Sequence, residues 1–270
     1  MSPTPPVDLE RFSGFADCYD AYRPQLPAVI ADILCQLAGT PRPNLVADLG
    51  CGTGLSMRLW VGRAQQVVGI EPNPDMRQLA QARFASLPAG NNLAVLDGNS
   101  AQTGLPDGSA DIVTCSQSLH WMEPQATFAE VARILRPGGV FAACDCDWPP
   151  TLNRPAEEAY TAFTRLAAEL ERERSVPQPL KWPKGEHLTR MRESGRFRFV
   201  KEILVHSVET GNADRLVGLA LSQGGIQTLL KRGVSQEELG LDRFRQAAES
   251  ALGPRPSNWY FSYRLRIGMR

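Results

Sequence analysis

The clearest chemical signal in the sequence is a pair of acidic residues separated by a glycine-rich turn. Asp48 comes at the end of a short apolar run, and Gly50, Gly52 and Gly54 follow it. Residues without a Cβ let the backbone turn sharply and let a ligand approach its amide groups. Glu71 lies 19 residues after Gly52, where a doubly wound fold places a carboxylate for two ribose hydroxyls. The pattern predicts a ribose-containing ligand on Glu71, with Asp48 available to an ammonium or hydroxyl group.

The spacing of the glycines argues against a dinucleotide as that ligand. A dinucleotide fingerprint has a third glycine five residues after Gly50, and this chain has Leu55 there. Residues 56–61 are predicted to form a helix directly after the turn. The free amide groups at its start favour a carboxylate or a phosphate.

Alternating strands and helices are predicted to position these residues. Short apolar runs bounded by proline or glycine are typical of buried parallel strands, and a 3.6-residue apolar period indicates helices. In the first half of the chain, strands are predicted at residues 45–47, 66–70, 93–97, 111–117 and 140–146, and helices at residues 26–37, 75–87 and 128–135. The RPGG sequence that begins at Arg136 is predicted to end the last of these helices.

The second half of the chain is predicted to complete the sheet. Residues 197–208 and 259–267 alternate in hydropathy, as the two strands of an antiparallel pair do. Helices are predicted at residues 156–172, 213–221 and 236–251, with a turn at Gly224 and Gly225. The predicted fold is α/β: a doubly wound, seven-stranded, mostly parallel sheet with an antiparallel C-terminal strand and a helical lid. We expect an N-terminal cap segment (1–40), a cofactor-binding core (41–150) and a part that completes the sheet and carries the substrate lid (151–270).

These pieces, in this order, resemble the class I (Rossmann-like) S-adenosylmethionine-dependent methyltransferases. The resemblance covers residues 45–146 and rests on VADLGCGTG, on IEPNPDM around Glu71, and on LPDGSAD followed later by LRPGG. It implies methyl transfer from S-adenosylmethionine. The residues expected to bind this cofactor are Tyr22, Arg23, Asp48, Gly50, Gly52, Glu71, Pro72, Asn99, Ser100, Ala101 and Gln117. The family has Glu where this chain has Ala101, so we expect that adenine contact to come from the backbone or from shape.

The acceptor side is predicted at the carboxyl ends of the strands, where ligands bind in doubly wound folds. The segment SQSLHWM follows the fourth strand, and its resemblance is to a small-molecule branch that includes trans-aconitate methyltransferases. The predicted substrate residues are Tyr19, His120, Trp121 and Trp148. His120 is the candidate general base, because imidazole titrates near neutral pH. For His120 and for the N-terminal tyrosines, a purely structural role remains the alternative.

Composition limits the remaining function classes. The 270 residues include 29 Lys and Arg and 29 Asp and Glu, so the basic excess typical of nucleic-acid binders is missing. No apolar run is long enough to cross a membrane, and no signal segment is evident. Six cysteines lie in or beside predicted core elements, which indicates free thiols and a cytoplasmic protein. Zinc-ligand spacing is absent, so no metal site is expected.

The predicted function is transfer of a methyl group to an oxygen, nitrogen or carbon nucleophile of a small molecule. Two alternatives remain open at this point: methylation of a protein or RNA, and a cofactor-binding regulatory protein without turnover.

Overall fold

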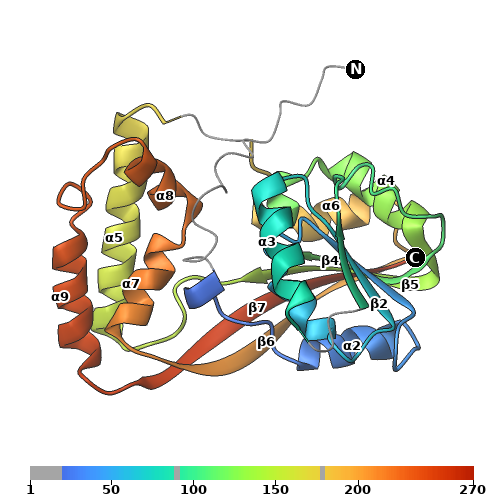
Figure 1. The fold of residues 1–270 in the computed structure, drawn as a ribbon, viewed down its shortest axis with the longest axis horizontal. Coiled ribbons are helices and arrows are strands. Elements are labelled where there is room, and N and C mark those ends of the chain that lie inside the picture. Colours follow the sequence, from blue (N-terminus) through green and yellow to red (C-terminus); the bar gives the residue numbers. More distant parts are fainter. Residues whose placement is uncertain (1–19, 88–91, 177–179) are drawn as a thin grey trace.

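A seven-stranded sheet organises the computed structural model, which describes residues 20–87, 92–176 and 180–270 (Figure 1). The strands are β1 (Leu45–Leu49), β2 (Gln66–Ile70), β3 (Leu93–Leu96), β4 (Ala110–Ser116), β5 (Leu135–Cys146), β6 (Phe199–Gly211) and β7 (Ser257–Met269). Their order across the sheet is β3-β2-β1-β4-β5-β7-β6. Strands β1 to β5 are mutually parallel, and β7 runs antiparallel to both of its neighbours. The predicted fold class is confirmed.

Helices surround the sheet and extend it on one side. The α-helices are α2 (Val29–Leu37), α3 (Pro74–Ala85), α4 (Pro124–Ile134), α5 (Arg154–Glu173), α6 (His187–Glu193), α7 (Ala213–Leu221), α8 (Gly224–Lys231) and α9 (Leu241–Leu252). Within the described residues, short 3₁₀-helices are η2 (Ser56–Trp60), η4 (Leu119–Trp121) and η5 (Lys184–Glu186). Helices α5, α7, α8 and α9 form a separate group at the far end of the long β6–β7 ribbon (Figure 1), which we call the helical lobe.

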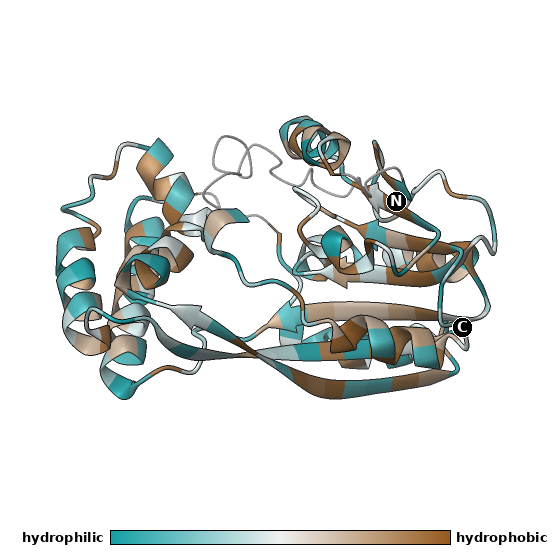
Figure 2. Cartoon of the chain, turned by 60° about the horizontal axis from the view of Figure 1, so that its bottom comes forward, coloured by the Kyte–Doolittle hydropathy of each residue, from teal (hydrophilic) through white to brown (hydrophobic). Residues whose placement is uncertain are grey.

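The central strands are buried on both faces, as their continuous apolar runs require. All five residues of β1 are buried. Val46 belongs to the hydrophobic cluster that includes Ile30 of α2, and its neighbour Ala47 belongs to the cluster that includes Phe128 of α4. Successive side chains of a strand point to opposite faces, so β1 connects two hydrophobic layers. Figure 2 shows the mostly hydrophobic strands between helices that are partly hydrophilic.

Asparagine side chains determine where three of the helices begin. Asn73, Asn153 and Asn212 each accept a hydrogen bond from the amide three residues later, at the starts of α3, α5 and α7. In α3 a proline follows the capping residue directly, and in α5 a proline is the second residue of the helix. A proline at the first helical position has no amide hydrogen to leave unbonded. The starts of α3 and α5 are therefore encoded locally in the sequence.

Three predicted elements differ in kind from those that the structure has. After the glycine turn, η2 is a five-residue 3₁₀-helix that ends because Val61 is extended and Gly62 has φ +72°. One such turn lacks the aligned dipoles of an α-helix. The segment after Ile134 belongs to β5 rather than to a helix end, because Gly138 and Gly139 exchange backbone hydrogen bonds with Arg270. Gly224 and Gly225 begin α8 instead of forming a turn.

A buried carboxylate fixes the start of the sheet. Asp111 of β4 accepts hydrogen bonds from the backbone amides of Asn44 and Leu45, at 2.7 and 3.1 Å. Its other oxygen lies 2.6 Å from Nε of Arg136. These donors hold the pKa of Asp111 below its ordinary value although burial opposes them. Asp111 thus joins the starts of β1, β4 and β5.

We expect Asp111→Ala to lower the free energy of unfolding by about 2–4 kcal/mol, because it leaves two amides and a guanidinium without their acceptor. The control is Asp97→Ala, which removes an ion pair whose carboxylate is 76% exposed and should cost less than about 1 kcal/mol. Urea denaturation measures both. Equal small losses would contradict a structural role for Asp111.

Candidate functional site

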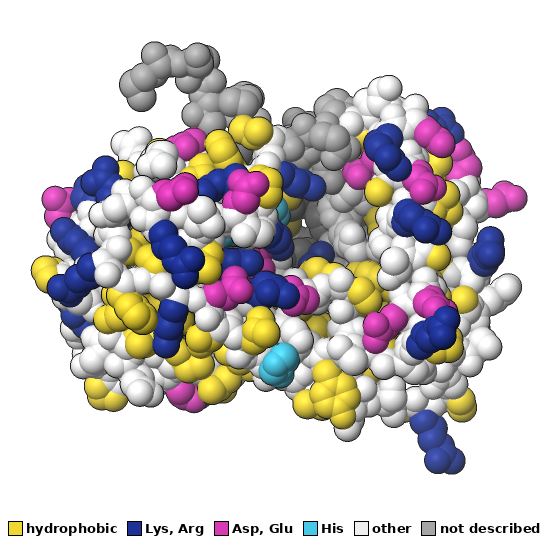
Figure 3. Space-filling model, turned by 180° about the vertical axis from the view of Figure 1, so that it is seen from behind, with side chains coloured by type: hydrophobic (Ala, Val, Ile, Leu, Met, Phe, Trp, Pro, Cys, Tyr) yellow, Lys and Arg dark blue, Asp and Glu magenta, His cyan; other side chains and the backbone are white. Residues whose placement is uncertain are grey.

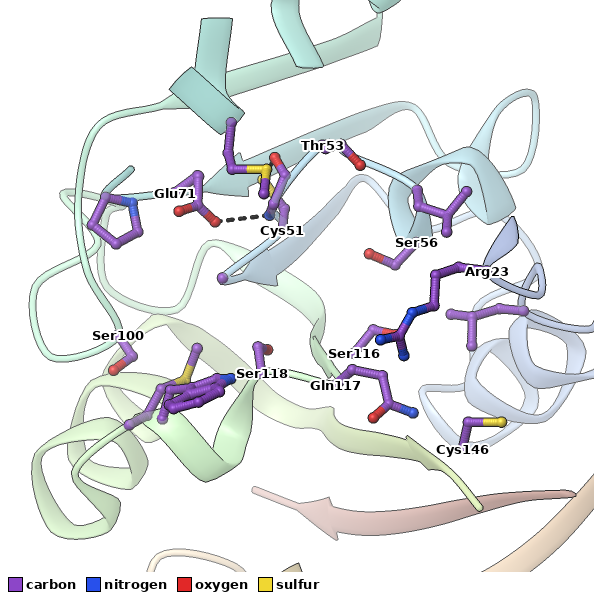
Figure 4. Close-up of a pocket in the computed structure, with 18 of the residues that line it drawn as sticks. Arg23, Cys51, Thr53, Ser56, Glu71, Ser100, Ser116, Gln117, Ser118 and Cys146 are labelled. Carbon is purple, nitrogen blue, oxygen red and sulfur yellow. Dashed lines mark hydrogen bonds between the residues drawn. The ribbon is translucent and has the colours of Figure 1, made fainter. Parts of the chain in front are cut away.

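A pocket opens at the carboxyl ends of β1, β2, β4 and β5 (Figure 4). Ligands bind at this edge in doubly wound sheets, where the strand order reverses. The predicted site residues that line it are Arg23, Gly50, Gly52, Glu71, Pro72, Asn99, Ser100, Gln117, Trp121 and Trp148. Ten residues from six separate stretches of the chain therefore share one cavity.

The glycine turn needs its glycines for two different reasons. Gly50, Gly52 and Gly54 all have positive φ. A Cβ on Gly54 would lie 2.2 Å from the Phe84 ring, and one on Gly50 would lie 2.9 Å from Cβ of Ser118. A Cβ on Gly52 would meet no atom within 4 Å. Gly50 and Gly54 are thus required for packing, whereas Gly52 turns its bare backbone toward open space.

Asp48 lies beneath the turn rather than in the wall of the pocket. It is 1% exposed, and its two carboxylate oxygens accept hydrogen bonds from the Ser56 and Thr114 hydroxyls. Burial raises its pKa to about 6. In this arrangement Asp48 shapes the turn through Ser56. Its predicted direct contact with a ligand stays a prediction.

Glu71 lies in the pocket wall at the end of β2, where it is tied to the glycine turn. One carboxylate oxygen accepts from the Gly52 amide at 2.7 Å (Figure 4), and the other accepts from the Asn73 amide at 2.9 Å. Burial raises the pKa of Glu71, and the two amides oppose that shift. Each carboxylate oxygen has a second lone pair, so both can still accept a hydroxyl hydrogen.

The loop after β3 forms the wall below Glu71. The Asn99 side chain accepts hydrogen bonds from the amides of Ala101 and Gln102, at 2.9 and 3.0 Å. The Ser100 hydroxyl lies 2.9 Å from that of Thr127. Ala101 is exposed and is not part of the pocket lining. The local turn around Asn99 therefore presents Asn99 and Ser100, and the contact predicted for Ala101 stays a prediction.

The segment after β4 forms the opposite wall. Gln117 has φ +54°, which is unusual for a residue with a side chain, and its amide donates to the Cys144 carbonyl at 2.8 Å. Its side-chain oxygen accepts from Nζ of Lys184 at 2.7 Å. Trp121 lies further along the same wall. Gln117 and Trp121 thus both line the cavity, and their contacts with cofactor and substrate stay predictions.

The N-terminal segment and the helical lobe meet at Arg23. Its guanidinium donates to the hydroxyl and the carbonyl of Ser222, at 2.9 and 3.1 Å, and lies 4.8 Å from the centre of the Trp148 ring. Tyr22 packs on Gly218 of α7, where a Cβ would lie 2.3 Å from the tyrosine ring. Tyr22 therefore faces the helical lobe rather than the cavity. Tyr19 lies outside the described residues.

His120 is adjacent to the pocket but does not line it. Its ring contacts Trp121 at a centroid distance of 4.7 Å, and its Nδ1 is buried without a hydrogen-bond partner in the described part of the chain. Burial, reinforced by the nearby Lys184 cation, lowers its pKa to about 3. His120 is thus neutral over the whole physiological range.

Several pocket residues were not predicted from the sequence. Cys51, Thr53, Ser116, Met122, Cys146 and Tyr263 also line the cavity. Lys184 contacts the lining residue Gln117 from a distant part of the sequence. Cys51 and Thr53 lie inside the glycine motif and could have been inferred from their position. Tyr263 and Lys184 could not, because only the tertiary fold brings β7 and η5 to this edge.

Comparison with known proteins identifies the central part of the chain. Residues 47–143 match the model of a methyltransferase domain family. This part of the chain is a methyltransferase domain, and the fold around it is that of the Rossmann-like, S-adenosylmethionine-dependent methyltransferases. S-adenosylmethionine is the cofactor of this class. The narrower likeness to trans-aconitate methyltransferases stays a prediction.

Similar methyltransferases share mainly this central part. An uncharacterized methyltransferase of Mycobacterium tuberculosis is 36% identical over 128 residues, which are 47% of this chain and 49% of that protein. The malonyl-[acyl-carrier protein] O-methyltransferase of Serratia marcescens is 32% identical over 130 residues, 48% of each protein. The chain therefore spans about half the length of the curated relatives it matches.

Solved structures extend the likeness in fold over nearly the whole methyltransferase. A proposed type II methyltransferase from Anaeromyxobacter dehalogenans superposes with a TM-score of 0.71 at 20% identity, covering 92% of this chain and 98% of that one. A geranyl diphosphate methyltransferase, solved with geranyl diphosphate and sinefungin, gives a TM-score of 0.50 at 18% identity, covering 90% of this chain and 78% of that one. At such identities the likeness concerns the fold.

The chemical groups that line the pocket fit S-adenosylmethionine. Glu71 offers carboxylate oxygens, and Gly52 leaves space for a ligand against the turn.

Within residues 20–87, 92–176 and 180–270, no His, Cys, Asp and Glu side chains cluster closely enough to bind a metal ion. In the same residues no helix combines the length and the apolar character of a membrane span.

We expect Gly54→Ala to lower the free energy of unfolding by about 3 kcal/mol or more, because its methyl group overlaps the Phe84 ring at a positive φ. Gly52→Ala is the matched control, since it has the same backbone strain but no overlap, and should cost about 1 kcal/mol. Urea denaturation compares the two variants. Equal losses would show that Phe84 moves aside without cost.

Proposed function

We propose that this methyltransferase moves the methyl group of S-adenosylmethionine to a small-molecule acceptor with an oxygen, nitrogen or carbon nucleophile. The observation that carries the proposal is the Glu71 carboxylate, held at the pocket wall by the amides of Gly52 and Asn73. A carboxylate with free lone pairs at the end of β2 suits the two hydroxyls of a ribose. The matched domain and its cofactor class support the same assignment.

In the proposed reaction the chain acts mainly by positioning. Bound S-adenosylmethionine supplies a methyl group that its sulfonium already makes electrophilic. Glu71 and the glycine turn hold the nucleoside, and the walls that carry Trp121 and Trp148 align the acceptor and exclude water. Fixing two reactants in line lowers the activation barrier, because their translational and rotational entropy is already lost on binding and not in the chemical step.

The pocket supports a small acceptor rather than a nucleic acid or a protein. Aromatic and apolar side chains line its acceptor side: Leu26, Trp121, Met122, Cys146, Trp148 and Tyr263. The face of the molecule in Figure 3 mixes positive and negative side chains, and the total charge is balanced. A phosphate backbone is usually met by a basic surface. A small, largely apolar acceptor suits these walls better.

The proposal includes the remaining expectations about the whole protein. We assign residues 1–40 to a cap, 41–150 to the cofactor core, and 151–270 to sheet completion and a substrate lid. Arg23 supports a cap that closes on the lid, because it bonds to Ser222 of the helical lobe from the pocket edge.

Free thiols at Cys35, Cys51, Cys115, Cys144 and Cys146 suit a reducing, cytoplasmic environment.

Calorimetric titration with S-adenosylhomocysteine, the demethylated product, tests the cofactor assignment. We expect the wild type to bind it and not NAD, and Glu71→Ala to weaken binding by about 1.5–3 kcal/mol through loss of charge-assisted hydrogen bonds. Asp97→Ala is the control, because it removes the carboxylate after the neighbouring strand β3, outside the pocket lining. An unchanged dissociation constant in Glu71→Ala would remove Glu71 from the site.

Turnover requires a separate measurement. Labelled S-adenosylmethionine incubated with a metabolite extract, followed by mass spectrometry, would identify the methylated product. Cofactor binding without any labelled small molecule, or with label in protein or RNA, would contradict the proposed acceptor class.

The pKa of His120 leads to a prediction about pH. Because its pKa in the fold, about 3, lies below the unfolded value of about 6.5, the unfolded chain binds more protons between these values. His120 therefore lowers stability as pH falls from about 6.5 toward 3. The melting temperature should therefore fall on acidification, and we expect a smaller fall in His120→Ala. His187, with a pKa of about 4, still contributes to the fall in that variant.

The same variant tests the predicted general base. A base with a pKa of about 3 is already deprotonated at pH 5, so His120 should add no acidic limb to the pH–rate profile between pH 5 and 8. We expect wild type and His120→Ala to share the shape of that profile. A limb near pH 6.5 that disappears in the variant would overturn this expectation.

A further inference from the structure

Gln117 presents hydrogen-bond donors to the pocket because of a lysine that lies far away in the sequence. Nζ of Lys184 is 2.7 Å from the side-chain oxygen of Gln117. An ammonium group has only donors, so the carbonyl oxygen of the amide must face the lysine. The NH₂ group is then the part of the Gln117 amide left for a ligand. Figure 4 shows the Gln117 side chain pointing into the cavity.

Lys184 is itself held in place by a buried carboxylate. Its Nζ lies 2.8 Å from Oδ1 of Asp145, and Oδ2 of Asp145 lies 2.7 Å from Nη1 of Arg266. Asp145 and Arg266 are 4% and 3% exposed. The adjacent amide of Trp182 donates to the His120 carbonyl at 2.8 Å, which anchors the segment before η5 next to the same wall. A fixed chain of contacts thus runs from the buried sheet through Lys184 to Gln117.

The order of the strands indicates which part of a ligand reaches Gln117. Glu71 follows β2 and Gln117 follows β4, and these strands flank β1 with its glycine turn. A nucleoside whose ribose lies on Glu71 must extend across the turn toward β4. In S-adenosylmethionine, the part beyond the ribose and sulfur is an amino acid with a carboxylate, which accepts hydrogen bonds.

We propose that Lys184 is a positioning residue that orients the Gln117 amide so that its NH₂ group donates to the amino-acid carboxylate of the bound cofactor. The inference rests on the proposed function. Lys184 lies outside the matched domain, residues 47–143, and is not part of the pocket lining. It acts through Gln117 and not by direct contact with the ligand.

The test compares two ligands that differ only at the amino-acid end. S-adenosylhomocysteine carries the amino acid, and 5′-methylthioadenosine keeps the nucleoside and the thioether without it. By calorimetric titration we expect Lys184→Met to weaken binding of S-adenosylhomocysteine about five- to tenfold and to leave that of 5′-methylthioadenosine within twofold. Lys201→Met removes a lysine from β6, outside the pocket lining, as the control for lost charge, and should change neither.

A double-mutant cycle separates positioning from direct action. If Lys184 acts through Gln117, Lys184→Met should have no further effect on S-adenosylhomocysteine affinity in a Gln117→Leu background. A further loss in that background would overturn the proposal, as would equal weakening of both ligands or no weakening at all in the single variant. Failure of the wild type to bind S-adenosylhomocysteine would instead overturn the proposed function.

Discussion

The hydrogen bond from the Gly52 amide to the Glu71 carboxylate is the contact on which the rest of the site depends. It joins the ends of two neighbouring parallel strands, β1 and β2, at 2.7 Å. The glycine turn can reach Glu71 only because Gly50 and Gly54 pack without side chains against Ser118 and Phe84. The same bond places the carboxylate next to the open backbone of Gly52. One contact therefore sets both the junction of the two strand ends and the position of the Glu71 carboxylate in the pocket wall.

Buried carboxylates support this arrangement at both ends of the strands, with opposite consequences for pH. Asp48 under the turn has its pKa raised to about 6 by burial, so its contribution to stability falls as pH rises from about 4 through 6. Asp111 at the other end has a lowered pKa because Arg136 and two amides donate to it. Its contribution is complete above about pH 4 and is lost as pH falls. At neutral pH the fold therefore keeps an ionised Asp48 at some cost in stability.

That cost is consistent with a role of Asp48 in the turn. Its two hydrogen bonds come from hydroxyl groups, which can donate to a carboxylate and can also adapt to its protonated form. Ser56 begins η2, and Thr114 belongs to the adjacent strand β4. A residue bonded to both fixes the direction in which the chain leaves β1, and the position of Gly52 follows from that direction.

The sequence predicted the parts of the structure that depend on short-range patterns. The strand at 66–70, the helix at 213–221 and the cavity around Gly52 and Glu71 follow from apolar periodicity and glycine spacing. The errors occurred where tertiary contacts override local preference. Gly138 is a reasonable helix terminator by composition, yet its backbone bonds to Arg270. A pairing partner more than a hundred residues away leaves no local signal.

The segment after β4 illustrates the same limit in the candidate site. His120 was predicted to be a general base because free imidazole titrates near neutral pH. Its surroundings, with Lys184 beside it and Nδ1 buried, determine a different pKa. The glutamine at position 117 was identifiable from its place after a strand, but its partner was not, because Lys184 is 67 residues away. The glycine turn and Glu71 lie within one contiguous domain, whereas Lys184 of η5 and Tyr263 of β7 come from outside it. Two chains with the same glycine motif can therefore share a cofactor and still differ in the molecule that they methylate.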